Sequence, residues 1–355
     1  EESLYILKPF KKELSMLGIG GSVSTPKSGI TANVLVVNNY DDLESESDKV
    51  KGKIVLYNVP FTNYTETVQY RYSGASRAAK YGAVASIVRS ISDWSMDTPH
   101  TGVMGYDANY DKIPTAAITI EDAMMLGRIY ERGQKITVKL QMEAKTVGDR
   151  WSRNIISEIK GHEYPEEIVV VGAHIDSWDV GQGAHDDGGG CIASWEVLRL
   201  IKTLGLKPKR TIRCVLWTNE ENGLRGSKSY RDMHLDELDK HIVAIESDAG
   251  VFAPQGFGFS GNRDARAIIE DILDLLKPMK ANQITDWGRA PDVAILNDER
   301  IPVMSLNVDL SKYFWYHHSA ADTFDKVDFH DFNKCVAAMA IMAFVIADLD
   351  RPLPR

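Results

Sequence analysis

Acidic and histidine side chains recur in this sequence shortly after apolar runs that are typical of buried β-strands. The apolar runs occupy residues 168–171, 212–217, 242–245 and 303–306. The side chains that follow them are His174, Asp176, Glu220, Glu221, Asp248 and, after an aromatic stretch, His318. In an open α/β sheet, ligands bind beyond the carboxyl ends of the strands. We therefore expect these side chains, which are far apart in sequence, to meet at one edge of a sheet.

These side chains are the donors that zinc uses in proteins. Imidazole and carboxylate groups both bind zinc, and two ions held by one bridging carboxylate can share a water and polarise a carbonyl. Asp186 is the predicted bridge, because glycines on both sides of it allow close backbone approach. His174 and Asp248 then complete one site with Asp186. Glu221 and His318 complete the other, so the sequence predicts two Zn²⁺ per chain.

The remaining acidic residues have predicted roles beside the ions. Glu220 stands where a general base would take a proton from the shared water and pass it to the leaving amine. Metal-bound histidines usually donate their other ring N–H to a fixed acceptor. Asp176 and Asp322 are therefore predicted to orient His174 and His318.

Each of these residues has an ordinary structural explanation when it is taken alone. A single histidine after a strand is more often a core or loop residue, Glu220–Glu221 is more often a solvated pair, and 248–250 is a plausible turn. Because all of these explanations would have to coincide at strand ends, a metal site explains the pattern better. His185 and His317 are left unassigned: His317 could line a substrate cleft or pack within the aromatic run 313–316.

The apolar runs of the second half alternate with amphipathic helical patterns. One pattern carries Ile192, Trp195, Leu198, Ile201 and Leu204 on one face, and another carries Ile268, Ile272, Leu275 and Leu276. Strands that alternate with helices predict an α/β fold with a doubly wound, mostly parallel sheet and right-handed crossovers.

The first half of the chain indicates a separate α/β module. Strand patterns occupy 30–38, 52–57, 85–89 and 135–142, and helical patterns occupy 74–81 and 123–131. This segment has no cluster of histidine, cysteine and carboxylate residues. We therefore expect it to lack chemistry of its own.

Length and charge restrict the possible functions. The 355 residues are enough for two domains, and 41 basic against 50 acidic residues give a formal charge of −9. Such a chain is a poor candidate for binding nucleic acid or an anionic membrane, and no apolar run approaches the roughly 20 residues that span a bilayer.

Cysteine usage does not identify a cellular compartment, but two other features bear on it. Cys191, Cys214 and Cys335 lack metal-ligand spacing and are predicted to pack in the core. Asn63-Tyr64-Thr65 is an acceptor sequence for N-glycosylation in a polar stretch. The chain also begins at Glu1 without an initiator methionine, which indicates a processed or truncated product. Together these features favour a secreted protein.

The polar motifs resemble those of the di-zinc aminopeptidase family, which includes bacterial leucyl aminopeptidases and glutamate carboxypeptidase II. The matching segments are GAHIDSWDVGQGAHDDGGG (172–190), TNEENG (218–223), ESDAG (246–250) and HHSAADT (317–323). Carried over by position, the resemblance implies His174, Asp186, Glu221, Asp248 and His318 as metal ligands and Glu220 as the base. It also implies a cis peptide bond between Asp186 and Asp187.

The resemblance also suggests a domain organisation and an activity. It implies that residues 27–144 form a protease-associated domain inserted into a peptidase fold made of residues 1–26 and 145–355. Hydrolysis of short peptides, most closely unblocked dipeptides, by a homodimer outside the cell or in lysosomes would follow. The chain departs from the family at Pro291, where Ser or Thr often precedes the acid, and at His185, where an apolar residue is expected.

Other functions remain to be weighed against a dipeptidase. A broader aminopeptidase would use the same ions and the same base. A metal-free binding protein would be expected to have lost some ligands, and a glutaminyl cyclase would use one zinc. The complete predicted ligand set favours a peptidase.

Overall fold

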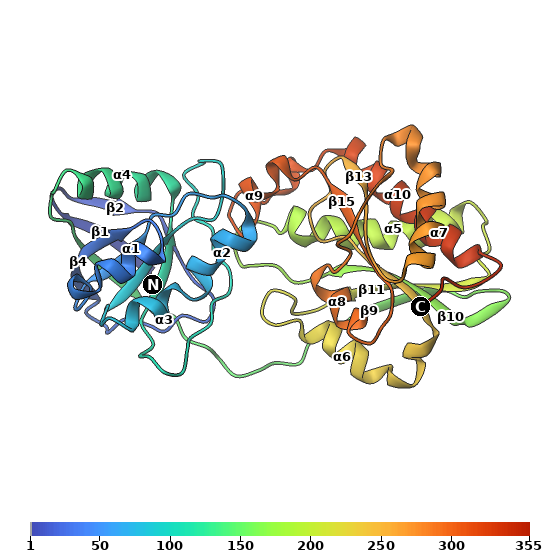
Figure 1. Cartoon of the computed structure of the whole chain (residues 1–355), viewed down its shortest axis with the longest axis horizontal. Coiled ribbons are helices and arrows are strands. Elements are labelled where there is room, and N and C mark those ends of the chain that lie inside the picture. Colours follow the sequence, from blue (N-terminus) through green and yellow to red (C-terminus); the bar gives the residue numbers. More distant parts are fainter. Residues whose placement is uncertain (1) are drawn as a thin grey trace. The chain divides into compact units, whose positions relative to one another are not determined.

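The computed structural model of the chain describes residues 2–355, which form two compact units. The first unit runs up to Arg150 and includes Phe314–Ala321, and the second comprises Trp151–Tyr313 and Asp322–Arg355. Figure 1 shows most of the first unit in blue to green and the second in green to red. Each unit has its own sheet.

The first unit contains an eight-stranded mixed sheet of order β2-β1-β8-β4-β5-β6-β7-β3. Its strands are β1 (Glu2–Lys8), β2 (Lys12–Leu14), β3 (Met16–Gly18), β4 (Ile30–Val37), β5 (Ile54–Tyr57), β6 (Ala85–Arg89), β7 (Thr115–Ile118) and β8 (Thr137–Met142). Strands β4 to β7 are parallel neighbours. The predicted strands at 30–38, 52–57, 85–89 and 135–142 are confirmed.

Helices cover both faces of this sheet. They are α1 (Tyr40–Ser45), α2 (Tyr64–Tyr72), α3 (Gly74–Ala79) and α4 (Ile120–Glu131). Alternate residues of each strand point to opposite faces, so Leu56 packs in one core with α4, while Tyr57 packs in another with α1 and α3. Figure 1 accordingly shows α4 on one side of the strands and α1 and α3 on the other.

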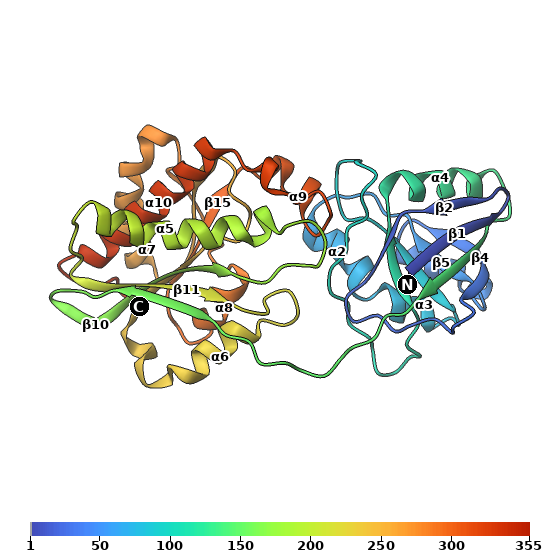
Figure 2. The same cartoon turned by 180° about the vertical axis from the view of Figure 1, so that it is seen from behind.

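Residues 2–18 belong to the first unit, so the assignment of residues 1–26 to the peptidase fold requires correction. Strand β1 pairs antiparallel with β8 and with β2, as Figure 2 shows at the edge of the sheet. Leu4 and Ile6 are completely buried in the same core as Leu140. The alternation of apolar and exposed residues in β1 fits a half-buried strand of this sheet, and one of its two neighbours, β8, is distant in sequence, as the pair Glu2 and Met142 shows.

The second unit is built on a seven-stranded sheet of order β14-β13-β15-β12-β10-β11-β9. Its strands are β9 (Ile155–Ile159), β10 (Tyr164–His174), β11 (Arg210–Trp217), β12 (His241–Glu246), β13 (Pro254–Ser260), β14 (Gln283–Thr285) and β15 (Val303–Val308). Strands β15, β12, β10 and β11 are parallel neighbours, whereas β9 and β13 run antiparallel to β11 and β15. The mostly parallel α/β sheet is confirmed.

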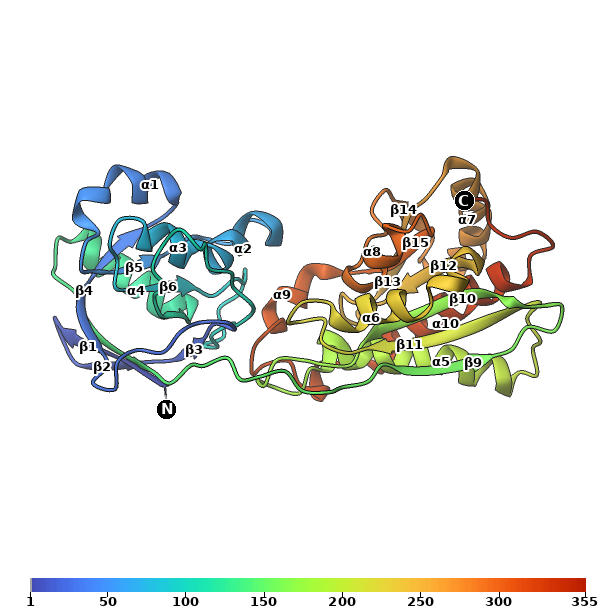
Figure 3. The ribbon, with the colours of Figure 1, turned by 90° about the horizontal axis from the view of Figure 1, so that it is seen from below.

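The helices of the second unit lie on two sides of this sheet, as Figure 3 shows. They are α5 (Gly189–Thr203), α6 (Arg225–Met233), α7 (Arg263–Leu273), α8 (Pro291–Asn297) and α10 (Phe329–Asp348), and the short α9 (Tyr313–Tyr316) joins the units. Val169 and Val171 pack with α5, α7 and α10, while Val170 packs with α6 and α8. Burial on both faces explains the unbroken apolar sequence of β10.

Helix α10 was not predicted, and it changes one statement about the sequence. By length and composition alone, Phe329–Asp348 is apolar enough to cross a membrane. In the structure its buried side, which includes Cys335, Met339 and Ile346, lies in the core beside α5. Cys191 and Cys214 are buried as well, so all three thiols are core residues as predicted.

A buried network of polar side chains connects β11, β12 and α6. Arg213 donates to the Tyr230 hydroxyl at 2.8 Å and forms an ion pair with Glu158 at 2.6 Å. The Tyr230 hydroxyl lies 2.8 Å from Nε2 of His241, whose Nδ1 donates to the carbonyl of Glu237 at 2.9 Å. Burial lowers the pKa of His241 to about 4, so the imidazole is neutral near pH 7.

This network predicts a pH-dependent contribution to folding stability. His241 has a folded pKa of about 4, whereas an unfolded histidine titrates near ~6.5, so the unfolded chain binds more protons between these values. The contribution is present above pH 6.5 and is lost as the pH falls toward 4. We expect the metal-free wild type to lose about 2 kcal/mol more unfolding free energy than His241→Asn between pH 7 and 5.

The measurement is urea unfolding in a chelating buffer at both pH values. His162→Asn, at an exposed histidine, is the matched control and should follow the wild type. An equal loss in wild type and His241→Asn would contradict the prediction.

Candidate metal centre

The parallel register of β10, β11 and β12 brings their carboxyl ends to one edge of the second sheet. His174, the last residue of β10, is paired with Trp217, the last residue of β11. Gly172 is paired with Glu246, the last residue of β12. Glu220, Glu221 and Asp248 follow within four residues of those ends, so the predicted side chains of this unit come from adjacent loops.

His174 is the centre of this cluster. Its Nε2 lies 3.2 Å from Oδ1 of Asp186 and 3.2 Å from Oδ1 of Asp248. Its Nδ1 lies 2.8 Å from the backbone carbonyl of Asp176, which can only accept a hydrogen bond. Nδ1 is therefore the protonated nitrogen, and Nε2 faces the carboxylates.

The charges around His174 suit a cation. Burial lowers the pKa of the imidazole, but Asp248 and Asp186 raise it well above its usual value. In the absence of another positive charge, the two carboxylates would retain a second proton on the ring. A metal ion can take the place of that proton, because metal binding to histidine releases protons.

The loop that carries Asp186 is held by hydrogen bonds to its backbone. The Asp322 carboxylate accepts from the backbone N–H of His185 at 2.8 Å and of Asp186 at 3.1 Å. The Asp187 carboxylate accepts from the N–H of His174 at 3.2 Å and of Gly190 at 3.1 Å. The predicted cis peptide bond between Asp186 and Asp187 is confirmed. Asp186 is thus fixed by its neighbours on both sides.

Gly190 illustrates why glycines follow the two acids. A Cβ atom there would lie 2.3 Å from Oδ1 of Asp187 and 2.3 Å from the carbonyl of Ser247. Both contacts are shorter than any side chain tolerates. The first turn of α5 can therefore approach the end of β12 closely only with glycine at this position.

Asp176 holds the loop after β11. Its Oδ1 accepts from the backbone N–H of Glu220 at 2.9 Å and its Oδ2 from that of Glu221 at 3.4 Å. Its own carbonyl, rather than its carboxylate, is the close acceptor for His174, since the nearer carboxylate oxygen lies 3.9 Å from Nδ1. The predicted pairing of Asp176 with His174 therefore occurs through the main chain.

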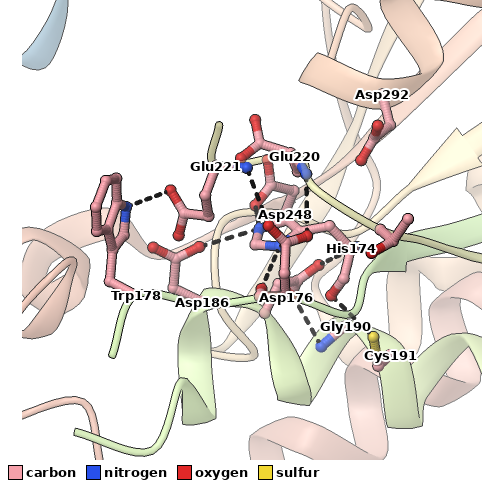
Figure 4. Close-up of polar contacts among 12 residues, drawn as sticks. His174, Asp176, Trp178, Asp186, Gly190, Cys191, Glu220, Glu221, Asp248 and Asp292 are labelled. Atoms are coloured by element: carbon pink, nitrogen blue, oxygen red, sulfur yellow. Dashed lines mark hydrogen bonds and ion pairs between the residues drawn. The ribbon is translucent and has the colours of Figure 1, made fainter. Parts of the chain in front are cut away.

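Trp178, which was not among the predicted site residues, also contacts a predicted ligand. Its indole Nε1 donates to Oε2 of Glu221 at 2.7 Å, the contact drawn as a dashed line in Figure 4. Because Trp178 lies in the segment 172–190, its position in that motif was the available signal. The hydrogen bond restricts the direction in which Glu221 presents its carboxylate.

The residues of this unit fit a metal ion by donor type and by distance. Ligand atoms of His174, Asp186 and Glu221 all lie within 4.8 Å of one another, and so do those of His174, Asp187 and Asp248. Imidazole nitrogen with carboxylate oxygen is a donor set that suits zinc. Since both Asp187 oxygens already accept backbone N–H groups, Asp187 is better explained as a structural support than as a ligand.

His318 belongs to the first unit, where its surroundings are well defined. Its backbone lies in the left-handed region, with φ of 59°. Its Nδ1 lies 3.2 Å from the carbonyl of Thr101, and its ring stacks on His317 with centroids 3.6 Å apart. His317 also makes edge contacts with Tyr64 and with Phe314, and the second of these favours its packing role within the aromatic run.

His185 and Asp292 are both buried, and neither is a predicted ligand. The His185 ring stacks on Phe252 with centroids 4.0 Å apart, and its Nδ1 accepts from the N–H of Val251 at 3.3 Å. His185 therefore packs in the interior, where an apolar residue was expected. Asp292 lies apart from the ligand cluster in Figure 4. Burial raises the pKa of Asp292 to about 7.

The chain matches the model of peptidase family M28 over residues 154–343 and that of the PA domain over residues 27–126. A crystal structure of a peptidase M28 precursor from Shewanella amazonensis superposes with a TM-score of 0.95 at 35% identity, covering 100% of this chain and 83% of that one. A zinc aminopeptidase from Bacillus subtilis shares the fold at 22% identity, with a TM-score of 0.70 over 99% of this chain and 82% of its own.

The chain belongs to peptidase family M28, and with its cluster of histidine and carboxylate ligands it is a metallo-exopeptidase. It is similar along its whole length to carboxypeptidase Q. Identity is 48% to the Xenopus laevis protein, covering 100% of this chain and 76% of that relative. Identity is 47% to the Homo sapiens protein, covering 100% of this chain and 75% of the relative.

The hydrogen bond from Trp178 to Glu221 should contribute to metal affinity. Trp178→Phe retains the aromatic ring and removes the N–H donor, so we expect zinc to bind about 10-fold more weakly at the site that contains Glu221. Competition with a chromophoric chelator measures this. Trp195→Phe, at an exposed position on α5, is the control. Equal zinc affinities for both variants would refute the role of the indole.

Proposed function

We propose that this chain hydrolyses unblocked dipeptides with a water held between two zinc ions. The observation that carries the proposal is the convergence of Asp186 and Asp248 on Nε2 of His174, at the carboxyl ends of parallel strands. Similar proteins support it, since one relative is a carboxypeptidase Q and one structure of the same fold is a zinc aminopeptidase.

The proposed ligand set is the one predicted from the sequence. His174 and Asp248 would hold one ion, and Glu221 and His318 the other, with Asp186 shared between them. One line of support is that the three acids of this set, Asp186, Glu221 and Asp248, group around His174. Another is the position of the proton on the His318 ring. Because Nδ1 of His318 faces a carbonyl, its Nε2 is left with the lone pair that a metal requires.

Glu220 is the proposed general base. When bound, zinc would lower the pKa of a coordinated water and polarise the scissile carbonyl. Glu220 would accept the proton of that water and deliver it to the nitrogen of the leaving amine, so that one C–N bond breaks as one C–O bond forms. The backbone N–H of Glu220 donates a hydrogen bond to Asp176. This bond fixes the loop that carries the proposed base Glu220 beside the proposed ligand Glu221.

The electrostatics of Glu220 agree with this role. Without metal, burial and then the charge of Asp248 raise the pKa of Glu220 to about 9. A positive charge held by Asp248 and His174 would offset this repulsion and favour the ionised carboxylate. Binding of the cation would therefore convert Glu220 into an active base near neutral pH.

A matched peptide panel tests the proposal. The zinc-loaded chain should hydrolyse a free dipeptide and should cleave its N-acetyl form, its C-terminal amide and a tetrapeptide much more slowly. Glu220→Gln is nearly isosteric but cannot accept the proton, so we expect the rate to fall by roughly 10²–10⁴-fold while zinc remains bound. Release of amino acids is measured by chromatography.

The panel separates the competing functions. Equal cleavage of the dipeptide, its amide and the tetrapeptide would make the chain a broader aminopeptidase. Binding of peptide without hydrolysis, in a chain that holds zinc, would favour a non-catalytic relative. Full activity of Glu220→Gln would remove Glu220 from the mechanism.

We also propose that the protein is secreted or lysosomal, glycosylated at Asn63, and homodimeric. The Asn63 side chain is exposed, and its Oδ1 caps helix α2 by accepting from the N–H of Glu66 at 2.9 Å. The amide nitrogen, to which a glycan would be attached, does not take part in that cap. In a homodimer the partner could limit substrate length.

Material secreted from a eukaryotic host tests the glycosylation and the homodimer. Treatment with an N-glycosidase should reduce the mass of the wild type, and Asn63→Gln should already lack that glycan. Thr65→Ala, which removes the hydroxyl residue of the same acceptor sequence and leaves Asn63 in place, is an independent way to abolish the glycan. Light scattering should give twice the chain mass. A monomer with full dipeptidase activity would exclude the homodimer.

A further inference from the structure

His318 is held in place by a loop of the first unit. Its backbone carbonyl accepts from the N–H of Thr101 at 2.9 Å. In return, the Thr101 carbonyl lies 3.2 Å from Nδ1 of His318. Thr101 and His318 are both buried, although 217 positions separate them in sequence. A single residue thus fixes both the main chain and the ring of His318.

Arg71 of helix α2 donates hydrogen bonds to the backbone of that loop. Its Nη1 donates to the Thr101 carbonyl at 3.1 Å and its Nε to the Val103 carbonyl at 3.3 Å. Gly102 between them has φ of +141°, and a Cβ there would lie 2.3 Å from the guanidinium carbon of Arg71. The loop is therefore shaped around the guanidinium, and the Thr101 carbonyl is oriented by Arg71 as well as by His318.

His100 fixes the residue on the other side. Its Nδ1 donates to the His317 carbonyl at 2.6 Å, and its own N–H donates to the Ser90 hydroxyl at 2.8 Å. His100 also forms an antiparallel bridge with Ser319. The carbonyl of the peptide group between His317 and His318 is therefore fixed by a hydrogen bond. The next residue, His318, has a φ of 59°, which is unfavourable for any residue other than glycine.

The burial of Arg71 costs free energy that supporting a loop does not by itself explain. The residue is only 3% exposed, and no carboxylate among residues 2–355 lies within ion-pairing distance of it. Its donors are directed instead at the carbonyls of Thr101 and Val103 and at the hydroxyl of Tyr64. A buried charge without a counter-ion is costly, so a purely structural role would be met more easily by an apolar residue.

We propose that Arg71 and His100 are positioning residues for His318 as a metal ligand. By fixing the Thr101 carbonyl and the 317–318 peptide, they hold the proton on Nδ1 and present Nε2 in one direction. This inference rests on the proposed function, in which His318 binds zinc.

The test compares zinc binding in paired variants of the whole chain. His100→Leu removes the donor to the His317 carbonyl, whereas His100→Asn retains an N–H donor near the position of Nδ1. We expect His100→Leu and Arg71→Met each to weaken one of the two zinc ions by about 10–100-fold, as outer-shell changes typically do. His100→Asn should restore most of that affinity. Arg77→Met, at an exposed arginine of α3, is the control.

Three readouts make the result specific. Chelator competition gives the two zinc affinities, urea unfolding of the metal-free chain reports folding, and the visible spectrum of the Co²⁺-loaded chain reports coordination. A merely structural role would lower unfolding stability and weaken both ions equally, and that result would overturn the proposal. Selective weakening of one ion, with rescue by His100→Asn, would support it. If Arg71→Met does not fold, the His100 pair decides the question.

His318→Ala separates this inference from the proposed function. If His318→Ala keeps both zinc ions at wild-type affinity, His318 is not a ligand and the proposed function fails with the inference. If His318→Ala loses one ion while His100→Leu and Arg71→Met bind like the wild type, the ligand stands and only the positioning role is overturned.

Discussion

Carboxylates are concentrated around Nε2 of His174, where Asp186 and Asp248 both approach to 3.2 Å. Most of this charge is withdrawn from water, and burial raises the pKa of Asp187 and of Glu220. Such a group of acids is unstable by itself, because like charges repel strongly in a medium of low dielectric constant. A bound cation relieves the repulsion, and the rest of the second unit can be understood as the scaffold that holds these acids until one binds.

The scaffold consists largely of backbone N–H groups directed at the acids. Asp176 receives two of them from the loop after β11, Asp187 receives those of His174 and Gly190, and Asp322 receives two from the loop that bears Asp186. These hydrogen bonds do not neutralise the charge, but they fix the loops that present the ligands. The side chains that face His174 are thus separated from those that support the loops.

The two units contribute differently to this arrangement. The second provides the parallel strands whose carboxyl ends gather the acids, as is usual for open α/β sheets. The first provides a separate sheet with helices on both faces and the close environment of His318. Similarity to carboxypeptidase Q covers both units, since the alignment with the Xenopus laevis protein spans 100% of this chain.

The sequence by itself determined the strands that bear the site and the acids that follow them. The apolar runs at 168–171 and 212–217 are buried on both faces, and such strands carry a signal that needs no knowledge of their partners. The tertiary structure alone decided that β1 joins the first sheet, that Trp178 donates to Glu221 and that Arg71 supports Thr101. The alternation in β1 predicts a strand but does not identify its neighbours, and the other two are single contacts between segments that are distant in sequence or irregular in conformation. The sequence does not reveal these partners, because the energy of each contact depends on a partner that only folding brings near.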